Sequence, residues 1–303
     1  MSEQGNENGE VVSAELETEA PIVEVAGEPI VDRRKPASVR RPDNPRVSVV
    51  VPALNEAKNV REILPYLSEY YEVILVDGHS VDGTVAAARE ALPGVKIVEQ
   101  TRQGKGNALA CGFEAATGEV IVMFDVDGSA DPNEIPDFVR ALVAGADLAK
   151  GTRFVKGGGS DDITLFRRIG NMGLNLLASA LTEHWFTDLC YGYNAFWADM
   201  LYMLDLPDTQ AKSDKLMLPG DGFEIEALII GRFALSGAKI TEVPSFEHDR
   251  YHGDSNLNAV RDGFRVLRTI LEDRAYARRI RTLARRRGAT NMPPPQRPGW
   301  MRD

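Results

Sequence analysis

The sequence predicts an α/β protein with a mostly parallel sheet flanked by helices. Short apolar runs alternate with helical patterns from residue 47 onward, and polar clusters directly follow three of these runs. Strands that alternate with helices form parallel sheets, and the ligands of such sheets bind outside the carboxyl ends of the strands. These observations therefore predict a fold class and also the edge of the sheet at which a site lies.

Each element has its own justification in the residue pattern. Runs rich in valine and isoleucine predict strands, and apolar residues spaced three and four apart predict the helices between them. The expected strands are 47–53, 72–77, 95–99, 119–124 and 238–244, and the expected helices are 56–70, 82–91, 105–116, 167–181, 222–235 and 257–287. Between residues 147 and 167 the pattern is irregular, and no element is predicted there.

The composition divides the chain into three parts. Residues 1–45 are rich in glutamate, proline and small polar residues and turn basic at 33–35, which is typical of a disordered tail. Residues 46–273 form the predicted domain. Residues 274–303 are expected to be the basic end of the last helix, followed by a loose tail.

Charge and cysteine content exclude several classes of protein. The net charge of −10 argues against a nucleic-acid partner, because neutralising phosphates needs a basic surface. Cys111 and Cys190 are too few for a disulfide framework, and the N-terminus lacks the pattern of a signal peptide. No run reaches the roughly 20 apolar residues that span a bilayer. We therefore expect a cytoplasmic protein, and a place on the inner face of the membrane stays open.

The stretch IVMFDVDGSADP at 121–132 places Asp125 and Asp127 directly after a buried strand. Carboxylates at positions i and i+2 of an extended segment point the same way and repel each other unless they share a cation or a proton. The stretch therefore predicts a cationic partner. In the alternative reading, Asp127 and Asp131 are caps of the helix that follows.

Five motifs occur in a fixed order along the chain: PALNE (52–56), VDGHSVDGT (76–84), GKGNAL (104–109), DVDGS (125–129) and GTR (151–153). This ordered set resembles the family two glycosyltransferases, and most closely the dolichyl- or polyprenyl-phosphate sugar synthases, over residues 46–273. The resemblance implies a Rossmann-like GT-A fold. It also implies an inverting, metal-dependent enzyme that moves a sugar from a UDP- or GDP-sugar to a polyprenyl phosphate.

The resemblance assigns the donor site residue by residue. It implies that Asp127, with Asp125 beside it, holds Mg²⁺ or Mn²⁺ on the donor diphosphate, that Asp77 reads the base through a ring N–H, and that Arg153 reaches the diphosphate. The full set implied for nucleotide-sugar binding is Pro52, Leu54, Glu56, Asp77, Lys105, Asp125, Val126, Asp127, Arg153 and Arg250.

Three of these assignments, at Asp77, Glu56 and Arg153, have structural alternatives, and for Arg153 the alternative is an ordinary solvated arginine. Asp77 is also a typical turn residue, and Asn55 is a typical helix cap with Glu56 in the first turn. Lys105 lies between two glycines that let the backbone approach a ligand closely, although the spacing is not that of a P-loop.

The sequence departs from the family pattern at several positions. Ser129 replaces a glutamine that helps to hold the metal, Leu54 replaces an aromatic residue, and Gly78 and His79 replace polar residues beside Asp77. The base is therefore left open between uracil and guanine. Arg250, Gly253 and Ser255 match a pattern of relatives that act on lipid phosphates, but Asn256 stands where these relatives carry a lysine, which weakens the implied lipid phosphate site. Arg250 and His252 can still donate to such a phosphate, although His252 by itself is read as an ordinary exposed or packed histidine.

The segment TDLCYGYNAFW (187–197) resembles the acceptor segment of the family and implies a catalytic role for Asp188, alongside the metal ligand Asp127. A hydroxyl acceptor needs a base to remove its proton, whereas a phosphate acceptor is already ionised. Asp188 is therefore either a base or a residue that positions the acceptor, and a loop cap is the structural alternative. Glu224 and Glu226 are read either as site residues or as ordinary helical carboxylates.

The last predicted helix is basic, with Arg274, Arg278, Arg281 and Arg285 at helical spacings. Such a helix binds an anionic membrane at about 1 kcal/mol per cation, or is simply solvated. Two other functions therefore stay open: a soluble transferase that glycosylates a hydroxyl of a small molecule or polysaccharide, and a nucleotide-sugar binding protein without turnover. The sequence makes no prediction of oligomeric state.

Overall fold

The computed structural model describes residues 41–67, 72–211, 216–253 and 259–286, and the side chains of the last helix from 261 to 275. Residues 1–40 of the predicted tail lie outside this part of the chain. So do Ser255, Asn256 and the side chains of Arg278, Arg281 and Arg285.

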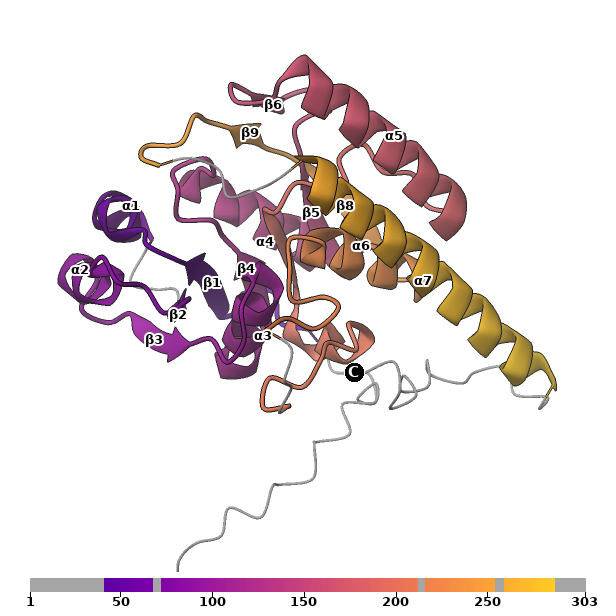
Figure 1. The fold of residues 1–303 in the computed structure, drawn as a ribbon, viewed down its shortest axis with the longest axis horizontal. Helices are drawn as coiled ribbons and strands as arrows, with labels where there is room; N and C mark the ends of the chain where they lie inside the picture. Colours follow the sequence, from indigo (N-terminus) through magenta and orange to yellow (C-terminus); the bar gives the residue numbers. More distant parts are fainter. Residues whose placement is uncertain (1–40, 68–71, 212–215, 254–258, 287–303) are drawn as a thin grey trace, which may run out of the picture. The chain divides into compact units, whose positions relative to one another are not determined.

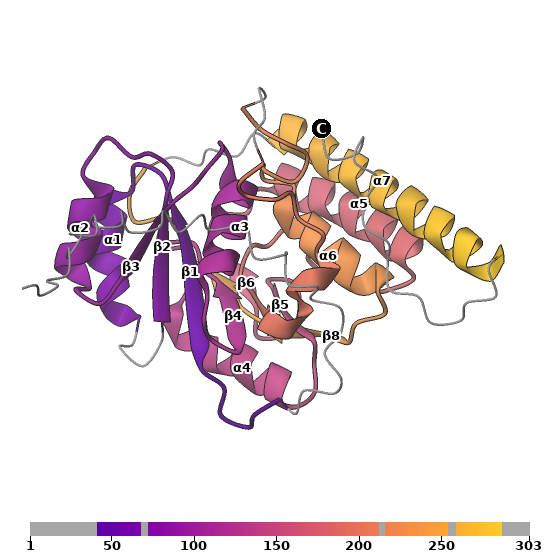
Figure 2. The same cartoon turned by 90° about the horizontal axis from the view of Figure 1, so that it is seen from below.

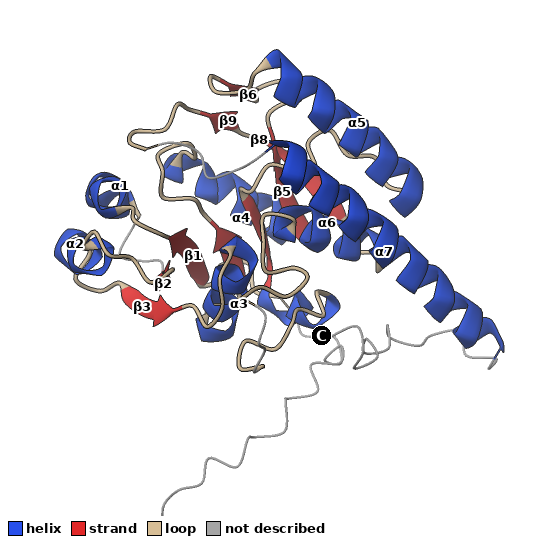
Figure 3. Cartoon of the chain, in the orientation of Figure 1, coloured by secondary structure: helices blue, strands red, loops and turns tan. Residues whose placement is uncertain are grey.

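The core of the protein is a seven-stranded sheet with the strand order β3-β2-β1-β4-β7-β5-β8 (Figure 3). All neighbouring strands are parallel except β7, which is antiparallel to both β4 and β5. The strands are β1 Val47–Ala53, β2 Glu72–Asp77, β3 Lys96–Glu99, β4 Val120–Met123, β5 Leu148–Thr152, β7 Asn194–Trp197 and β8 Ile240–Pro244. The predicted mostly parallel sheet is confirmed.

Helices cover the sheet and extend beyond it on the side of β8 (Figures 1 and 2). They are α1 Ala57–Ile63, α2 Thr84–Ala91, α3 Lys105–Ala115, α4 Ile135–Val143, α5 Leu165–Thr182, α6 Ile225–Leu235 and α7 Ala259–Arg286. Helix α3 packs on β1, β2 and β3, whereas α4 packs on β5, β7 and β8. Helices α5, α6 and α7 lie side by side, and a two-stranded ribbon of β6 (Gly159–Ser160) and β9 (Phe246–Glu247) lies near the start of α5.

Most differences from the predicted elements have a local cause. The predicted helix 56–70 ends at Ile63 and continues as a 3-10 turn through Pro65, because proline cannot donate to a helical hydrogen bond. Strand β5 was not predicted, because its sequence LAKGT contains a lysine and a glycine that rarely occupy a central strand. Strand β7 was not predicted either, since its four residues NAFW are too short to show a period.

The folded part of the chain begins before the predicted boundary at residue 46. The Arg41 guanidinium donates to the carboxylates of Asp147 at 2.6 Å and Asp199 at 3.2 Å, and it stacks over the ring of Trp197. These contacts attach residues 41–45 to the strands β5 and β7.

The strand directions bring distant segments to one edge of the sheet. Ala53 pairs with Asp77, so the carboxyl ends of β1 and β2 are level. Because β7 is antiparallel, its first residue Asn194 pairs with Met123 at the carboxyl end of β4. One edge of the sheet therefore carries the loops that follow β1, β2 and β4 and the segment that precedes β7. The polar clusters in the sequence predicted this position for the three loops.

Candidate functional site

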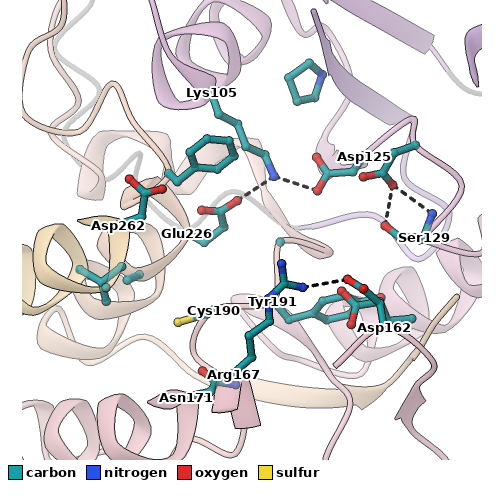
Figure 4. A pocket seen from close by; sticks show the side chains of 18 of the residues that line it. Lys105, Asp125, Ser129, Asp162, Arg167, Asn171, Cys190, Tyr191, Glu226 and Asp262 are labelled. Carbon is teal, nitrogen blue, oxygen red and sulfur yellow. Dashed lines mark hydrogen bonds and ion pairs between the residues drawn. The ribbon is translucent and has the colours of Figure 1, made fainter. Parts of the chain in front are cut away.

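A cavity of about 660 Å³ opens at this edge of the sheet (Figure 4). Nine of the eleven predicted site residues line it: Pro52, Leu54, Glu56, Lys105, Asp125, Val126, Asp127, Arg153 and Arg250. They come from the ends of β1, β4 and β5, from the start of α3 and from the segment after β9. Asp77 and Asp188 do not line the cavity.

The two aspartates of the DVD motif each have a cationic partner from the protein. A carboxylate oxygen of Asp125 lies 2.8 Å from Lys105 Nζ, and one of Asp127 lies 2.8 Å from a guanidinium nitrogen of Arg250. The other oxygen of Asp127 accepts hydrogen bonds from the backbone N–H and the hydroxyl of Ser129. The sequence predicted a cationic partner for these aspartates, and the structure supplies Lys105 for Asp125 and Arg250 for Asp127. The hydrogen bonds from Ser129 orient the Asp127 carboxylate.

The alternative reading of this stretch as a set of helix caps holds for Asp131 alone. The Asp131 carboxylate accepts a hydrogen bond from the backbone N–H of Asn133 and so caps the turn that leads into α4. Asp127 instead faces the cavity, although the residue as a whole is 95% buried. The segment with Arg250 lies directly over the loop, since the backbone N–H of Tyr251 donates to the Asp127 carbonyl at 2.9 Å.

Lys105 is the first residue of α3 and binds two carboxylates. Its Nζ lies 2.8 Å from Asp125 and 2.7 Å from Glu226 of α6 (Figure 4). Burial disfavours the charged form, but the charges of Asp125 and Glu226 outweigh it and raise the pKa of Lys105 above its ordinary value. Glu226 is thus a site residue that the sequence left undecided, because only the fold brings α6 to α3.

The glycines beside Lys105 allow a close approach to a neighbouring loop of the protein. A Cβ atom at Gly106 would lie 1.9 Å from the Gly220 carbonyl oxygen, and one at Gly104 would lie 2.1 Å from the Asp221 carbonyl oxygen. The backbone N–H of Gly106 donates to that Asp221 carbonyl at 2.7 Å. The glycines are therefore needed for close packing of the start of α3 against the loop before α6.

Arg153 follows β5 and is held by a fork-shaped contact with Asp188. Its Nε and Nη2 atoms donate to the two carboxylate oxygens at 2.7 and 2.9 Å, and Nη1 donates to Glu247 at 2.8 Å. Its guanidinium also stacks over the ring of Tyr191 at 4.8 Å. This planar arrangement is the one in which arginine holds carboxylates and phosphates best.

Of the two roles that the sequence left open for Asp188, its surroundings favour a positioning residue over a catalytic base. The residue is fully buried, and its oxygens accept hydrogen bonds from Arg153 and from the side-chain amide of Asn171. Burial by itself raises the pKa of a carboxyl, but the hydrogen bonds and charge of Arg153 lower the pKa of Asp188 below its ordinary value. A base must touch the proton that it removes, so Asp188 acts here on Arg153 instead.

The first two loops are joined to each other by hydrogen bonds. The backbone N–H of Glu56 donates to the Thr84 hydroxyl, and that of Ala57 donates to the Asp82 carboxylate. Asn55 does not cap α1 as the alternative reading expected, because its side-chain oxygen accepts from the N–H of Val81. The Glu56 side chain lines the cavity, and burial together with the nearby charge of Asp127 raises its pKa above the ordinary value.

Three other predicted residues lie away from the cavity. His252 contacts Glu62 through Nε2 at 2.7 Å and does not line the cavity, in keeping with the reading of an ordinary exposed histidine. Glu224 accepts hydrogen bonds from the backbone of Gly220 and Gly222 before α6. Arg274 pairs with Glu183 at 2.8 Å and is largely buried, so it is not part of a solvated cationic face.

The segments around α5, α6 and α7 contribute both apolar and polar side chains to the cavity. The apolar ones, here called the apolar wall, are Ile163, Phe166 and Leu174 of the α5 region and Phe223, Phe264, Val266 and Leu267 near α6 and α7, and the polar ones include Asp162, Arg167, Asn171 and Asp262. Phe166 and Phe264 are exposed by 69% and 68%. The outer face of α5 continues this apolar surface with exposed Leu165, Ile169, Met172 and Leu176.

The DVD carboxylates fit a hard divalent cation. Mg²⁺ is typically bound through one or two carboxylates and completes its shell with substrate phosphates and water. Asp125 and Asp127 supply two such carboxylates facing a cavity large enough for a nucleotide sugar. Within the described residues no group of three or more histidine, cysteine, aspartate or glutamate side chains forms a complete metal site. The donor set therefore fits a metal that binds together with a diphosphate.

Comparison with known proteins identifies the class. The family described as glycosyl transferase family 2 matches residues 48–202, half of the chain. Glycosyltransferase AglJ of Haloferax volcanii is 30% identical over 223 residues, which cover 72% of this chain and 68% of AglJ. The chain belongs to glycosyltransferase family 2, and the predicted class of enzyme is confirmed.

Further similarities concern a second relative and the fold. Dolichol-phosphate mannosyltransferase of Pyrococcus furiosus is 28% identical over 70% of this chain, which spans 59% of that relative's length. Glucosyl-3-phosphoglycerate synthase from Mycobacterium tuberculosis, solved with Mn²⁺, UDP-glucose and phosphoglyceric acid, superposes with a TM-score of 0.59 at 23% identity, over 77% of this chain and 80% of that one. The predicted GT-A fold is confirmed. In the part of the chain that the structure describes, no helix is both long enough and apolar enough to cross a membrane.

Proposed function

We propose that the protein transfers a sugar, with inversion, from a UDP- or GDP-sugar to a polyprenyl phosphate at the inner face of the membrane, with Mg²⁺ or Mn²⁺. The observation that carries this proposal is the make-up of one cavity. Acidic residues with their cations line one side of it, and the other side carries the apolar wall of the α5, α6 and α7 segments, with the polar Asp162, Arg167, Asn171 and Asp262 among its residues. A nucleotide diphosphate fits the first side, and an isoprenoid chain with a phosphate head fits the second.

On the donor side, Asp127 and Asp125 would hold the metal ion. When bound, this ion neutralises the charge that develops on the leaving diphosphate. Ser129 keeps the Asp127 carboxylate in one orientation through the hydrogen bond from its hydroxyl at 2.6 Å. Lys105, whose raised pKa keeps it protonated, adds a fixed positive charge on the same side of the cavity.

On the acceptor side, Arg153 is the residue we assign to the acceptor phosphate. Asp188 and Glu247 hold its guanidinium in one plane, and Tyr191 supports one face of it. We propose that Asp188 is a positioning residue that acts through Arg153. Arg250, which lines the cavity between the DVD motif and the apolar wall, would contribute a second guanidinium to the phosphates.

The ion pairs in the cavity support a phosphate as acceptor. Asp125, Asp127, Asp162, Glu226 and Glu247 line the cavity, and each is paired with a lysine or arginine. A carboxylate paired with a cation is a weak base. A phosphate is already ionised at neutral pH and needs no base, so this arrangement suits it better than a hydroxyl.

The apolar wall supports a lipid acceptor. Leu165, Phe166, Ile169, Met172 and Leu176 are exposed along α5, and Arg168 is exposed beside them. An amphipathic helix with apolar and basic residues lies in the interface of an anionic membrane. The relative named dolichol-phosphate mannosyltransferase supports the same class of acceptor.

One observation favours the second candidate, transfer to a hydroxyl of a small molecule. Glu56 lines the cavity and has a raised pKa, which is a property of general bases. The fold neighbour solved with phosphoglyceric acid supports a small phosphorylated acceptor.

Transfer assays with matched acceptors distinguish the two candidates. The full chain is incubated with Mn²⁺ and radiolabelled UDP-glucose or GDP-mannose, together with polyprenyl phosphate in anionic vesicles or with phosphoglycerate in solution. We expect label in the lipid fraction, and none after chelation of the metal. Label in phosphoglycerate alone, with loss of that transfer in Glu56→Gln, would instead establish the hydroxyl acceptor.

A further inference from the structure

A row of three polar side chains crosses the sheet next to the acceptor segment, residues 187–193. Lys150 of β5 pairs with Asn194 of β7 on one side and with Glu242 of β8 on the other. Residues that lie directly opposite each other in neighbouring strands point to the same face of the sheet. The proposed mechanism uses none of the three, although Lys150 directly precedes the GTR motif.

The two outer members of the row are bonded to the acceptor segment. The Asn194 side-chain amide donates to the Tyr191 carbonyl at 3.1 Å. The Glu242 carboxylate accepts from the backbone N–H of Thr187 at 2.7 Å and from its hydroxyl at 2.9 Å. This face of the sheet therefore supports the acceptor segment at both of its ends.

Lys150, the middle member, joins the acceptor segment to the GTR segment. Its Nζ donates to the Tyr191 carbonyl at 3.0 Å and to the Gly151 carbonyl at 2.6 Å. Arg153 belongs to the second of these segments, and the Tyr191 ring of the first lies against its guanidinium at 4.8 Å. Lys150 therefore fixes both parts of the chain that set the position of Arg153.

The fold gives Lys150 no ion pair at its ammonium group. The residue is fully buried, and both groups that accept from it in the described part of the chain are neutral carbonyl oxygens. An apolar side chain in this strand would avoid the cost of taking a charge out of water. A charge that is kept at such a cost beside a site indicates a task in that site.

The charged and titratable groups around Lys150 come from three parts of the chain. They are Asp188, Cys190 and Tyr191 of the acceptor segment, Arg153 after β5 and Glu242 of β8. Burial disfavours the charged form of Lys150, and the attraction of Asp188 offsets only part of this, so the pKa falls from 10.5 to about 8. Lys150 therefore changes its charge near neutral pH.

We infer that Lys150 is a positioning residue of the acceptor side, which joins the GTR segment to the acceptor segment and adds a buried positive charge that strengthens the binding of a phosphate monoester at Arg153. The inference rests on the proposed function, because it concerns the phosphate that Arg153 is assigned to hold. Lys150 does not line the cavity, so it acts through its charge and through the position of Arg153 rather than by contact.

Deprotonation of Lys150 should leave its hydrogen bonds in place. A neutral amine keeps two N–H groups, which is the number that the carbonyls of Gly151 and Tyr191 need. The charge is lost, however, so an anion at Arg153 is attracted less strongly. By linkage, an anion bound there favours the protonated lysine, and binding should take up protons from solution just above pH 8.

Calorimetric titration of the full chain measures both effects. The probes are farnesyl phosphate and phosphoglycerate, because the second pKa of a phosphate monoester is about 6 and its charge changes little at higher pH. The donor side is first filled with Mg²⁺ and either UDP or GDP. From pH 7 to pH 9 we expect the Kd of the probe to rise about fivefold. Titrations in buffers of different ionisation enthalpy should show uptake of about half a proton near pH 8.5.

Three variants assign the proton. Lys150→Met keeps the side-chain length and should bind the probes about tenfold more weakly at pH 7, with a constant Kd up to pH 9 and no proton uptake. Lys96→Met is the matched control, because it removes a partly exposed lysine from the edge strand β3, and it should keep the profile of the parent chain. Cys190→Ser should keep the proton uptake, which distinguishes Lys150 from the neighbouring thiol.

The possible failures of this inference and of the proposed function are distinct. A Kd that is independent of pH in the parent chain, or a profile like the parent's in Lys150→Met, would overturn this inference alone. Binding of phosphoglycerate but not of farnesyl phosphate, with proton uptake that Lys150→Met abolishes, would support the inference and overturn the lipid acceptor. Absence of binding by either probe at every pH would overturn the proposed phosphate acceptor together with this inference.

Discussion

The two sides of the cavity are built in different ways. The proposed donor side comes from the parallel strands β1, β2 and β4, and its two DVD aspartates differ in exposure. The Asp125 side chain is exposed by 34%, whereas that of Asp127 is exposed by 7%. The acceptor side comes from β5, β7 and the helices α5–α7, and its key acid Asp188 is fully buried behind Arg153. The DVD carboxylates thus face the cavity beside their paired cations, whereas Asp188 lies outside the cavity lining and holds Arg153.

This difference predicts how the donor side and the acceptor side should respond to substitution. An exposed carboxylate on the donor side can be lost without damage to the fold, because water replaces it. One member of a buried ion pair on the acceptor side cannot be removed without damage to the fold, because its partner is then left as a buried charge with no counterion or water. Donor-side variants should therefore lose binding at a small cost in stability, and acceptor-side variants should lose stability with nucleotide binding unchanged.

The largest expected effect is that of Asp188→Asn on stability. This change leaves the buried guanidinium of Arg153 with Glu247 as its remaining carboxylate partner, and we expect a cost of about 3–5 kcal/mol in the free energy of unfolding. Nucleotide binding should stay within a factor of about two of the parent's, and the KM for the acceptor should rise. Urea denaturation, calorimetry and acceptor kinetics measure the three effects, and a stable variant with a collapsed kcat would restore Asp188 as a base.

The stability that Asp188 contributes to the folded protein should depend on pH in a predictable direction. Because the pKa of Asp188 is lower in the folded protein, its stabilisation is present above the unfolded value near 3.8 and is lost as the pH falls through the folded value. The difference in unfolding free energy between the parent chain and Asp188→Asn should therefore shrink below pH 4. A difference that stays constant down to pH 2 would contradict the assignment.

Asp127→Asn should have the next largest effect, and on the donor side alone. Loss of one anionic ligand should remove metal-dependent donor binding and slow transfer by about 10²–10³-fold. The cost in stability should be smaller than that of Asp188→Asn, because the partner Arg250 is 31% exposed and stays in contact with water. Asp131→Asn is the matched control, because asparagine caps a turn as well as aspartate does and Asp131 lies outside the cavity. If both variants keep their metal dependence, the metal assignment fails.

A third contrast concerns Lys150, which is fully buried in β5 on the acceptor side. Its Nζ donates to the backbone carbonyls of Gly151 and Tyr191, and burial lowers its pKa from 10.5 to about 8. Between these pH values the unfolded chain binds a proton that the folded chain does not, so stability rises with pH. Relative to Lys150→Met, the parent should gain roughly 3 kcal/mol from pH 8 to 10.5. Parallel stability curves for the two proteins would refute this.

The smallest expected effect tests the apolar wall. Phe166→Ser and Phe264→Ser each remove an exposed ring from the cavity wall, and each should weaken use of a polyprenyl phosphate and binding to anionic vesicles by about tenfold. Affinity for the nucleotide should not change. Tyr66→Ser removes an equally exposed ring from the donor half and serves as the control. Equal loss in all three variants would show that the wall has no special role.

Much of the donor side was predictable because its residues are set by local pattern. Each parallel strand is a continuous apolar run, and the residue just after it must lie at the carboxyl edge of the sheet. The positions of Asp125, Asp127, Glu56 and Lys105 at the cavity therefore follow from the sequence pattern. The acceptor side was harder, because the antiparallel β7 and the lysine-containing β5 show no such run.

The sequence by itself determined the fold class, the glycosyltransferase family and the edge of the sheet that carries the site, since these depend on periodicity and on motifs a few residues long. Only the tertiary structure decided which charges meet. Lys105 reaches Glu226, Arg250 reaches Asp127 and Arg153 reaches Asp188 across many residues of chain. Such pairs are decided by strand order and helix packing, because a buried carboxylate takes whichever cation the fold brings within reach, and its environment then sets whether it binds a metal, removes a proton or holds an arginine.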